Sequence, residues 1–262
     1  MVQETYLRYQ ATPPESIRDL KPFLTTIVTR LSLDQLKSAR LQRESYIGPW
    51  LPEPLLTESG GSWVNPSGRE TEYESISMAF LLLLEKLSPV ERAVFLLREV
   101  FDYDYPEIAR IVDKEEAACR QIFHRAKKHV NENRPRFHTT PEEHRHLIDR
   151  FLRATIEGDV DGLVSLLAED VTSWSDGGGK VAGAATRPVQ GRDKVARFMV
   201  ALAHSRRAPQ GLTLEIVEVN GMPAIVVRTK EGAPILVITT EVSGGLIRNF
   251  RLVANPDKLK HF

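Results

Sequence analysis

Residues 105–130, YPEIARIVDKEEAACRQIFHRAKKHV, decide how the rest of the chain is interpreted. The spacing of apolar residues predicts a short helix over 105–111, a tight break at 112–114 and a second helix that begins at Glu115. The apolar face of this second helix consists of Ala118, Cys119, Ile122, Phe123, Ala126 and Val130. Its other face is basic or polar. Two helices joined by a turn of about three residues, the second apolar inside and basic outside, are typical of a helix-turn-helix.

The second helix of such a motif enters the major groove of DNA. The candidate DNA contacts are Arg120, Gln121, His124, Arg125, Lys127 and Lys128. Arg and Gln side chains can bond base edges, whereas lysines near the end of the helix more often contact phosphates. Arg125 lies at the edge of the apolar face, so an internal ion pair with Glu91 or Glu99 explains it as well as a phosphate contact does. The pattern alone also fits an ordinary helix pair with a solvated basic face.

The preceding segment adds a more specific signal. Leu87-Ser88-Pro89 is a helix start, with proline just inside the helix, and apolar residues then recur at helical spacing over 90–100. The run LSPVERAVFLLREVFDYDYPEIARIV, followed by RQIFHRAK, resembles region 4 of the bacterial extracytoplasmic-function (ECF) sigma factors. The resemblance implies that residues 72–137 read the −35 promoter element and that the protein binds core RNA polymerase.

The N-terminal segment carries a second resemblance. VQETYLRY, residues 2–9, and the helical pattern from Pro22 to Glu44 resemble the later part of sigma region 2, which in the family reads the −10 element. Its candidate cations are Arg30, Lys37, Arg40 and Arg43. The family has further helices before this point, so residues 1–44 are expected to be a partial region 2. A late start codon, a truncation and a shortened natural variant would each account for that.

Residues 45–71 are rich in Pro, Gly and Ser, which predicts a linker. The segment also contains Tyr46, Ile47, Trp50, Leu51, Leu55, Leu56 and Trp63, and this apolar content indicates docking on another surface. The stretch YIGPWLPEP resembles the linker of one ECF subgroup. Members of that subgroup carry a C-terminal domain of the SnoaL-like, NTF2-like type.

Residues 141–262 are predicted to form that domain, with a C-terminal tail. A helix begins at Thr140-Pro141, and strands are predicted at 171–174, 180–185, 212–219, 224–229, 235–241 and 246–253, with a helix over 191–204. Helices followed by an antiparallel sheet are an α+β pattern, and residues 141–253 resemble the NTF2-like cone. The predicted fold class is therefore multidomain, with all-α sigma regions followed by an α+β domain.

Three short motifs are hallmarks of the subgroup that the chain resembles, and we expect them to be regulatory. Their residues are Trp50, Leu51, Pro52, Glu53 and Pro54 in the linker; Asp176, Gly177, Gly178, Gly179 and Lys180; and Asn255, Pro256, Asp257, Lys258 and Leu259. The glycine-rich motif lacks the spacing of a phosphate-binding loop, and it is interpreted as a turn.

Composition limits the remaining possibilities. The chain has 262 residues, with 35 Lys and Arg against 35 Asp and Glu, so any DNA binding must depend on local basic patches. Cys119 is the only cysteine, which excludes an intrachain disulfide and fits a reducing compartment such as the bacterial cytoplasm. No apolar run approaches the ~20 residues of a membrane span. No metal site, cofactor or catalytic residue is predicted.

We therefore expect a sigma factor whose own C-terminal domain regulates it by holding the linker and the tail, 255–262. The alternative is a small-molecule-binding or enzymatic NTF2-like domain fused to a DNA-binding helix-turn-helix. The polar residues near predicted strand ends that keep it open are Asp176, Lys180, Arg187, His204, Arg248 and Asn249. An inert polymerase-binding decoy is a third hypothesis, and an unknown small ligand in the cone stays open.

Overall fold

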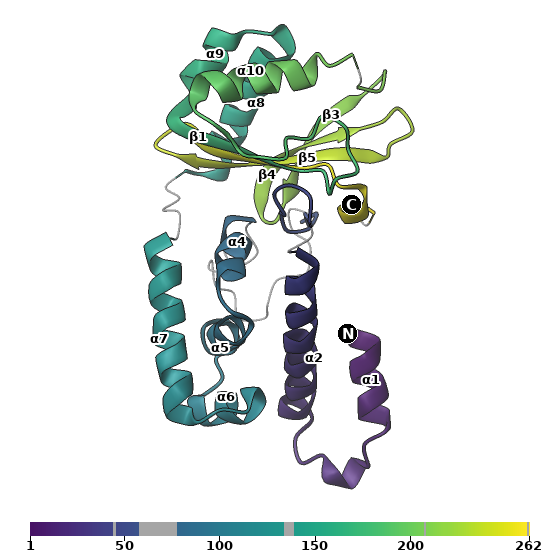
Figure 1. Ribbon diagram of the computed structural model, residues 1–262, viewed down its shortest axis with the longest axis vertical. Helices are drawn as coiled ribbons and strands as arrows, with labels where there is room; N and C mark the ends of the chain where they lie inside the picture. The colour runs from purple at the N-terminus through teal and green to yellow at the C-terminus, as the bar shows by residue number, and fades with distance from the viewer. Residues whose placement is uncertain (44–45, 58–77, 134–138, 207, 261) are drawn as a thin grey trace. The chain divides into compact units, whose positions relative to one another are not determined.

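A computed structural model describes the chain except for residues 44–45, 58–77, 134–138, 207 and 261, and except for the side chains of 37–43, 79, 132–133 and 141. The chain divides into two compact units (Figure 1). Unit 1 comprises 1–45 and 83–134, and unit 2 comprises 46–82 and 135–262. The described linker residues therefore belong to unit 2, together with the C-terminal domain.

Unit 1 is helical, as the apolar spacing predicts. Its helices are α1 (Val2–Gln10), α2 (Leu20–Arg43), the end of α4 (Met78–Lys86), α5 (Pro89–Glu99), α6 (Tyr105–Val112) and α7 (Glu116–Asn133), with a 3-10 turn at Pro14–Ser16. The apolar pattern of the sequence also predicts a helix over 73–86; it is observed from Met78 on, and residues 73–77 lie outside the described part. Helix α2 packs against α5 and α6, and α7 packs against α5 and α6 as well.

Local capping explains where two of these helices begin. Ser88 and Glu91 form a capping box at α5, and Asp104 and Glu107 form one at α6. In each box the N-cap side chain accepts a hydrogen bond from a backbone N–H that would otherwise have no partner, and the glutamate accepts one from the N-cap N–H. These contacts depend on residues three positions apart, which is why the sequence predicts them well.

Unit 2 has an α+β fold. Helices α8 (Pro141–Glu157), α9 (Val160–Leu166) and α10 (Arg192–Ala203) accompany strands β1 (Leu167–Asp176), β2 (Val189–Gln190), β3 (Thr213–Val219), β4 (Met222–Arg228), β5 (Pro234–Ser243) and β6 (Leu246–Val253). The three helices cover one face of the sheet (Figure 1). This is the arrangement that the resemblance to the NTF2-like cone implies.

The strand order is β2-β1-β6-β5-β4-β3. The prediction of an antiparallel sheet was wrong in one place, because β1 and β6 pair in parallel, with Ser173 opposite Phe250. Parallel neighbours need a long crossover connection, and here α10 and four strands, β2 to β5, separate β1 from β6 in the chain. The predicted hairpin turn at Gly244-Gly245 is confirmed between β5 and β6.

The predicted strand over 180–185 was also wrong. These residues form turns and bends, and the strand that pairs with the middle of β1 is the two-residue β2. Gly178, Gly179 and Gly183 have positive φ angles of 59°, 72° and 93°, which take the backbone out of the extended region.

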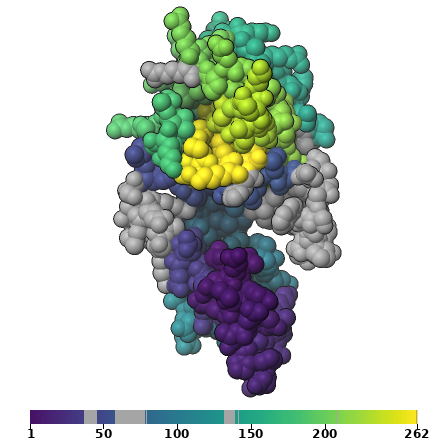
Figure 2. Space-filling view, turned by 90° about the vertical axis from the view of Figure 1, so that its right-hand side faces the viewer, coloured from purple at the N-terminus to yellow at the C-terminus, as the bar shows by residue number. Residues whose placement is uncertain are grey.

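The sheet has an apolar layer on each face. Under the helices, the main core includes Phe151 and Phe250, whose ring centroids are 4.9 Å apart. On the opposite face, buried valines of β3 to β6 pack with Leu51 of the linker and Leu259 of the tail. The C-terminal residues, yellow in Figure 2, gather on one surface of this unit. The linker and the tail therefore complete the second apolar layer of the sheet.

Candidate nucleic-acid interface and linker site

The helix-turn-helix is formed by α6 and α7. Asp113 ends α6 in the left-handed conformation, with φ of 54°, and α7 begins three residues later at Glu116. The buried side of α7 includes Cys119 and Ala126, both fully buried, and Phe123, which stacks on Phe95 of α5 at 6.2 Å. The predicted apolar face is confirmed, with Ala118 half-buried at its edge. Burial raises the pKa of the Cys119 thiol, which suits a structural role.

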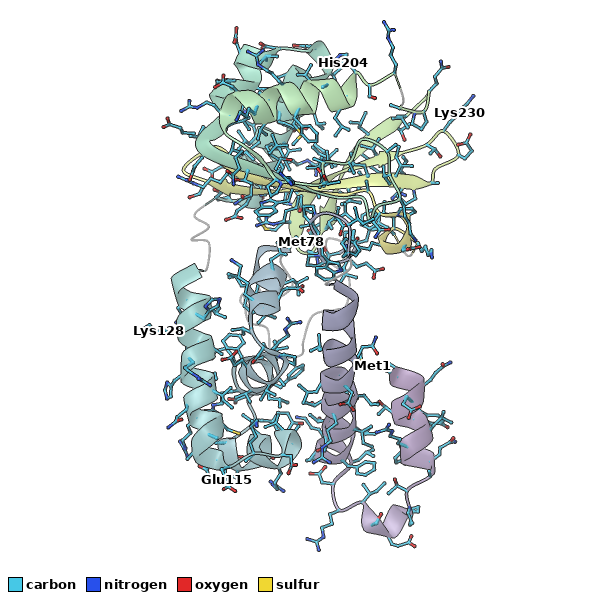
Figure 3. All side chains as sticks on the ribbon, in the orientation of Figure 1. Met1, Met78, Glu115, Lys128, His204 and Lys230 are labelled. Atoms are coloured by element: carbon cyan, nitrogen blue, oxygen red, sulfur yellow. The ribbon has the colours of Figure 1, made fainter. Side chains whose placement is uncertain are left out.

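The six predicted DNA-contacting residues lie on the outer side of α7. Arg120, Gln121, His124, Arg125 and Lys128 are exposed, and Lys127 is half-buried. Figure 3 labels Glu115 at the start of α7 and Lys128 along it. Helix α7 therefore has an exposed cationic surface opposite its buried apolar face.

Three of these cations, Arg120, Arg125 and Lys127, have acidic partners within unit 1. Arg120 pairs with Glu116 and lies over the ring of Tyr105 at 4.5 Å. Lys127 lies 3.0 Å from Glu99. Exposed ion pairs contribute only about 0–1 kcal/mol, so these acidic partners hold the cations weakly.

For Arg125, the structure supports the internal ion pair. Its guanidinium is 3.9 Å from the carboxylate of Glu91, at the start of α5. The hydrogen bond from the Ser88 hydroxyl, with a further contribution from the charge of Arg125, lowers the pKa of Glu91. The side chain is still 71% exposed, so the contact restrains Arg125 without burying it.

Of the four candidate cations of α2, the structure describes the side chain of Arg30. Arg30 donates hydrogen bonds to the carbonyl oxygens of Arg110 and Ile111, both at 3.3 Å, near the end of α6. Cations are favourable there because the last helical carbonyls have no intrahelical partner. In this state Arg30 therefore supports the helix-turn-helix. The side chains of Lys37, Arg40 and Arg43 are among those not described.

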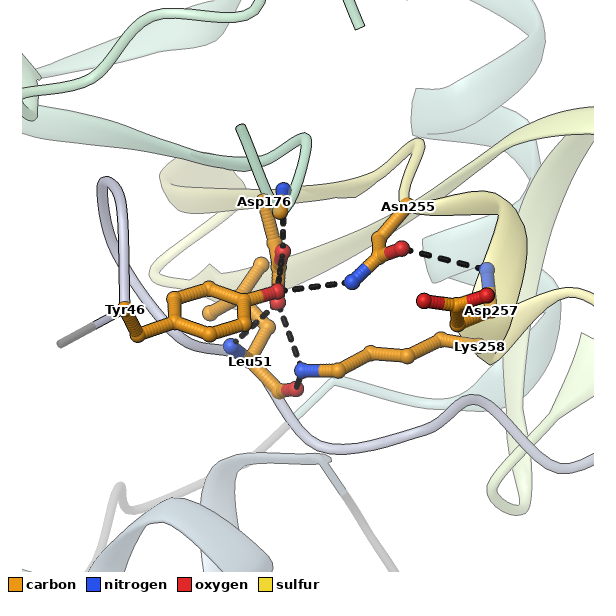
Figure 4. Close-up of polar contacts among 7 residues, drawn as sticks. Tyr46, Leu51, Asp176, Asn255, Asp257 and Lys258 are labelled. Carbon is orange, nitrogen blue, oxygen red and sulfur yellow. Dashed lines mark hydrogen bonds and ion pairs between the residues drawn. The ribbon is translucent and has the colours of Figure 1, made fainter. Parts of the chain in front are cut away.

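A second polar site joins the three predicted motifs (Figure 4). Asp176, at the end of β1, is fully buried. Its carboxylate accepts hydrogen bonds from the Tyr46 hydroxyl, from the backbone N–H of Leu51 at 2.8 Å and from the N–H of Gly178 at 3.1 Å. Lys258 of the tail completes the set, with its Nζ 2.7 Å from Oδ2 of Asp176. We call the residues Tyr46, Trp50, Leu51, Asp176, Asn255 and Lys258 the linker node.

Aromatic rings of the linker surround the lysine. The Lys258 ammonium lies 4.0 Å from the ring centroid of Trp50 and 5.3 Å from that of Tyr46, and it donates to the carbonyl oxygen of Leu51. Asn255 donates to the Tyr46 hydroxyl at 2.8 Å. Burial, together with the bond to Asp176, raises the pKa of Tyr46, which keeps the phenol protonated. The buried ion pair between Lys258 and Asp176 thus connects the linker, the end of β1 and the C-terminal tail.

The remaining motif residues surround this node. Pro52 and Pro54 are buried and Glu53 is exposed. Lys180 pairs with Asp257, which also lies 2.9 Å from Lys260, and the hydrogen bond from Lys180 lowers the pKa of Asp257 to about 2. Gly178 must remain small, since an added Cβ would lie 2.4 Å from Nδ2 of Asn255.

The six residues that kept a catalytic interpretation open do not share one set of partners, and Arg187 is exposed. Asp176 and Lys180 belong to the linker node and its surroundings, whereas Arg248 pairs with Asp170 and Asn249 donates to Glu241. His204 bonds the carbonyl of Val200 in its own helix. The described residues also hold no group of three or more His, Cys, Asp or Glu side chains placed to bind a metal ion. None of the helices in the described ranges has the length and apolar character needed to cross a membrane.

Sequence reasoning missed two contributions to this site. It counted Tyr46 only as an apolar linker residue, although its hydroxyl bonds both Asp176 and Asn255. It also missed the turn Asn220-Gly221, which contacts the linker farther along. The Asn-Gly pair is a strong hairpin signal, but nothing in the sequence indicates which segment such a turn touches.

The fold and the site together define a helix-turn-helix protein with an α+β domain that holds its linker. Residues 77–130 match the model of the family "Sigma-70, region 4". The chain is 39% identical over 203 residues to the ECF RNA polymerase sigma factor SigJ of Mycobacterium tuberculosis, covering 77% of this chain and 64% of that protein. It is 34% identical over 180 residues to the probable sigma factor SigI of the same species, covering 67% and 60%.

The crystal structure of M. tuberculosis SigJ superimposes with a TM-score of 0.70 at 32% identity, covering 98% of this chain and 87% of the other. The chain belongs to the extracytoplasmic function sigma factor family. It spans 64% and 60% of the lengths of the two curated relatives.

Proposed function

We propose that this protein binds core RNA polymerase and directs it to promoters as a sigma factor, in the bacterial cytoplasm. The observation that carries the proposal is the exposed cationic surface of α7, opposite its buried apolar face, within the segment that matches region 4. Such a helix fits the major groove and presents donors to base edges and phosphates. The names of the relatives support the same activity.

The side chains of α7 have different proposed roles. Arg120, Gln121 and His124 lie in its first half, where a recognition helix contacts bases. Lys127 and Lys128 lie farther along and serve phosphates, with Arg125 as a weaker candidate because of its contact with Glu91. For the −10 element, the proposed cations are Arg30, Lys37, Arg40 and Arg43 of α2.

The proposed polymerase contact is the first helix of unit 1. Val2, Tyr6 and Leu7 of α1 are 85%, 56% and 58% exposed. An exposed apolar group of this kind is typical of a protein–protein interface.

Duplexes selected by the polymerase-bound protein from a randomised pool would test the DNA proposal. Arg120→Ala is expected to weaken binding to the selected duplex by about 1–3 kcal/mol and to relax one base position. Lys127→Ala is expected to weaken binding to all duplexes and to reduce the salt dependence. Lys194→Ala, on α10 of unit 2, is the control. Equal binding by all variants would refute the assignment.

We further propose that unit 2 regulates this activity through the linker. The linker joins the two sequence segments of unit 1, and its residues from Tyr46 to Thr57 are bound by unit 2. Release from the linker node would lengthen the tether between the two DNA-reading parts. Such a switch needs only a few kcal/mol of differential contact.

The test of regulation is deletion of the tail from Asn255. Deletion removes Asn255 and Lys258 from the linker node and is expected to change promoter output in a reconstituted transcription reaction. Lys260→Met, which leaves the node intact, is the matched control. Unchanged output from the deletion variant would reject this regulatory role.

In this proposal unit 2 acts by contact and not by catalysis. The separate partners of its polar residues support that view. A small-molecule function is the second candidate. It is favoured by Nδ1 of His144 and Oγ of Ser173 and Ser175, which are buried without a hydrogen-bond partner among the described residues. A thermal-shift screen of the full chain against metabolites, followed by a turnover assay, distinguishes binding from catalysis.

A further inference from the structure

The linker meets unit 2 at a second place, beyond the three motifs. Leu55 and Thr57 lie beside the end of β3 and the turn that joins β3 to β4. Leu56 forms an antiparallel bridge with Val219, and the N–H of Thr57 donates to the carbonyl of Glu218 at 3.0 Å. This part of the linker therefore lies along the β3 edge of the sheet and pairs with it through a single antiparallel bridge.

Asn220 makes the most specific contacts there. Its backbone N–H donates to the carbonyl of Leu55 at 2.8 Å, and its side-chain Oδ1 accepts the N–H of Leu55 at 3.1 Å. The next residue, Gly221, donates its N–H to the Thr57 hydroxyl at 2.9 Å. A single turn thus satisfies both backbone groups of Leu55 and the side chain of Thr57.

The chemistry of this contact differs from that of the linker node. Leu55 and Leu56 are 52% and 41% exposed, whereas Leu51 is 2% exposed. Apolar burial therefore holds the linker at Leu51 but contributes little at the turn, where backbone hydrogen bonds predominate. Hydrogen bonds of this type each add only about 0.5–1.5 kcal/mol of stability, but their pairing defines which linker residue lies opposite which residue of β3.

The simplest alternative is that Asn220 serves only the hairpin. Asn220 and Gly221 have φ angles of 52° and 73°, and Asn-Gly is a preferred pair for such turns. Yet Asn220 is 1% exposed, and its Nδ2 is buried with no partner among the described residues. A buried donor without a partner costs about 1–3 kcal/mol. A glycine would form the same turn without that cost, so the turn alone does not account for the asparagine.

We propose that the turn 219–221 is a second, independent binding site for the linker, and that Asn220 is a positioning residue that sets the register of residues 55–57 on β3. This inference builds on the proposed regulatory role of the linker and adds a site to it. The linker node holds residues 46–51 through a buried ion pair and apolar burial, whereas the turn holds residues 55–57 through hydrogen bonds. Partial release at one site then leaves the other in place.

The test is amide hydrogen exchange of the full-length chain, resolved by residue. The reporters are the amides of Leu51, Leu55 and Thr57, which bond Asp176, Asn220 and Glu218 respectively. Asn220→Gly keeps the turn conformation and removes the acceptor, so we expect exchange at Leu55 to rise at least tenfold while Leu51 changes less than twofold. Asn220→Asp retains an acceptor oxygen and is expected to preserve the protection of Leu55.

A variant of the other site completes the design. Lys258→Met is expected to raise exchange at Leu51 and to leave Leu55 protected. Unchanged exchange at Leu55 in Asn220→Gly would overturn the proposal. An equal loss of Leu55 protection in Asn220→Gly and Asn220→Asp would also overturn it, since the acceptor oxygen would then not be what protects this amide. A joint rise at all three amides in every variant would overturn the independence of the two sites. None of these outcomes depends on transcription, so a failure here is distinguishable from a failure of the proposed function.

Discussion

Lys258 and Asp176 form a buried ion pair, with Nζ 2.7 Å from Oδ2 and side-chain exposures of 12% and 0%. They are 82 residues apart in the sequence. Asp176 ends β1, and Lys258 follows the last strand, so the pair depends on the parallel pairing of β1 with β6. The ammonium group also lies 5.3 Å from the ring centroid of Tyr46 and 4.0 Å from that of Trp50, both in the linker.

Replacing the lysine should destabilise unit 2. In Lys258→Met, the carboxylate of Asp176 stays buried but loses its cation, and breaking a buried pair in this way costs about 3–5 kcal/mol. The free energy of unfolding from urea titration measures the effect. Lys260→Met, whose lysine is 63% exposed, should change stability by less than about 0.5 kcal/mol. A loss below about 1 kcal/mol in Lys258→Met would show that the pair contributes little.

Two glycines with similar backbone conformations should respond differently to alanine. Gly178 and Gly244 have φ angles of 59° and 61°, so each variant carries a conformational cost of about 1 kcal/mol. Only at Gly178 would the new Cβ also meet a side chain, at 2.4 Å from Nδ2 of Asn255, whereas Gly244 faces open space. We therefore expect Gly178→Ala to be the more destabilised variant and to increase proteolysis of the linker. Equal stability and equal cleavage in the two variants would contradict this.

The stability of unit 2 should depend on pH through His144. Its ring is fully buried against Thr240, with Nε2 at 2.6 Å from Oγ1, and burial lowers its pKa to about 4. An unfolded histidine titrates near pH ~6.5, so the unfolded state binds more protons between the two values. The contribution is fully present above pH ~6.5 and is lost as the pH falls toward ~4, by about 3 kcal/mol.

The measurement is the difference in unfolding free energy between wild type and His144→Leu at several pH values. Carboxyl groups titrate in the same pH range in both proteins, so their contributions to the unfolding free energy largely cancel in the difference. The variant should lack the extra pH dependence, and His124→Leu, at an exposed position, should retain it. Parallel pH profiles for wild type and His144→Leu would exclude the buried imidazole as the source.

Freeing Lys127 should strengthen DNA binding. Its ammonium is 3.0 Å from both carboxylate oxygens of Glu99, and Glu99→Gln removes this competing charge. Because an exposed pair contributes about 0–1 kcal/mol, we expect affinity for any duplex to rise by up to about fivefold at low salt, with a smaller gain at high salt. Glu157→Gln, in unit 2, makes the same change in net charge and serves as the control. An equal gain in DNA affinity in both variants would show that the change in net charge, and not the release of Lys127, causes the effect.

The sequence by itself determined the features that depend on neighbours in the chain. The boundaries of α5 and α8 follow from helix starts at Ser88-Pro89 and Thr140-Pro141, where each cap bonds a residue three positions away. The buried and exposed faces of α7 follow from helical periodicity, because the side chains that share a face recur every three or four residues.

Only the tertiary structure decided which distant segments meet. The parallel pairing of β1 with β6, the absence of a strand over 180–185 and the contact of Asn220 with Leu55 each depend on how the sheet is ordered. The apolar linker residues indicated docking, but any exposed apolar surface would have satisfied that pattern. The particular partners of Tyr46 and Lys258 follow from packing across the whole domain, since hydrogen bonds and ion pairs between distant residues leave no periodic trace in a single sequence.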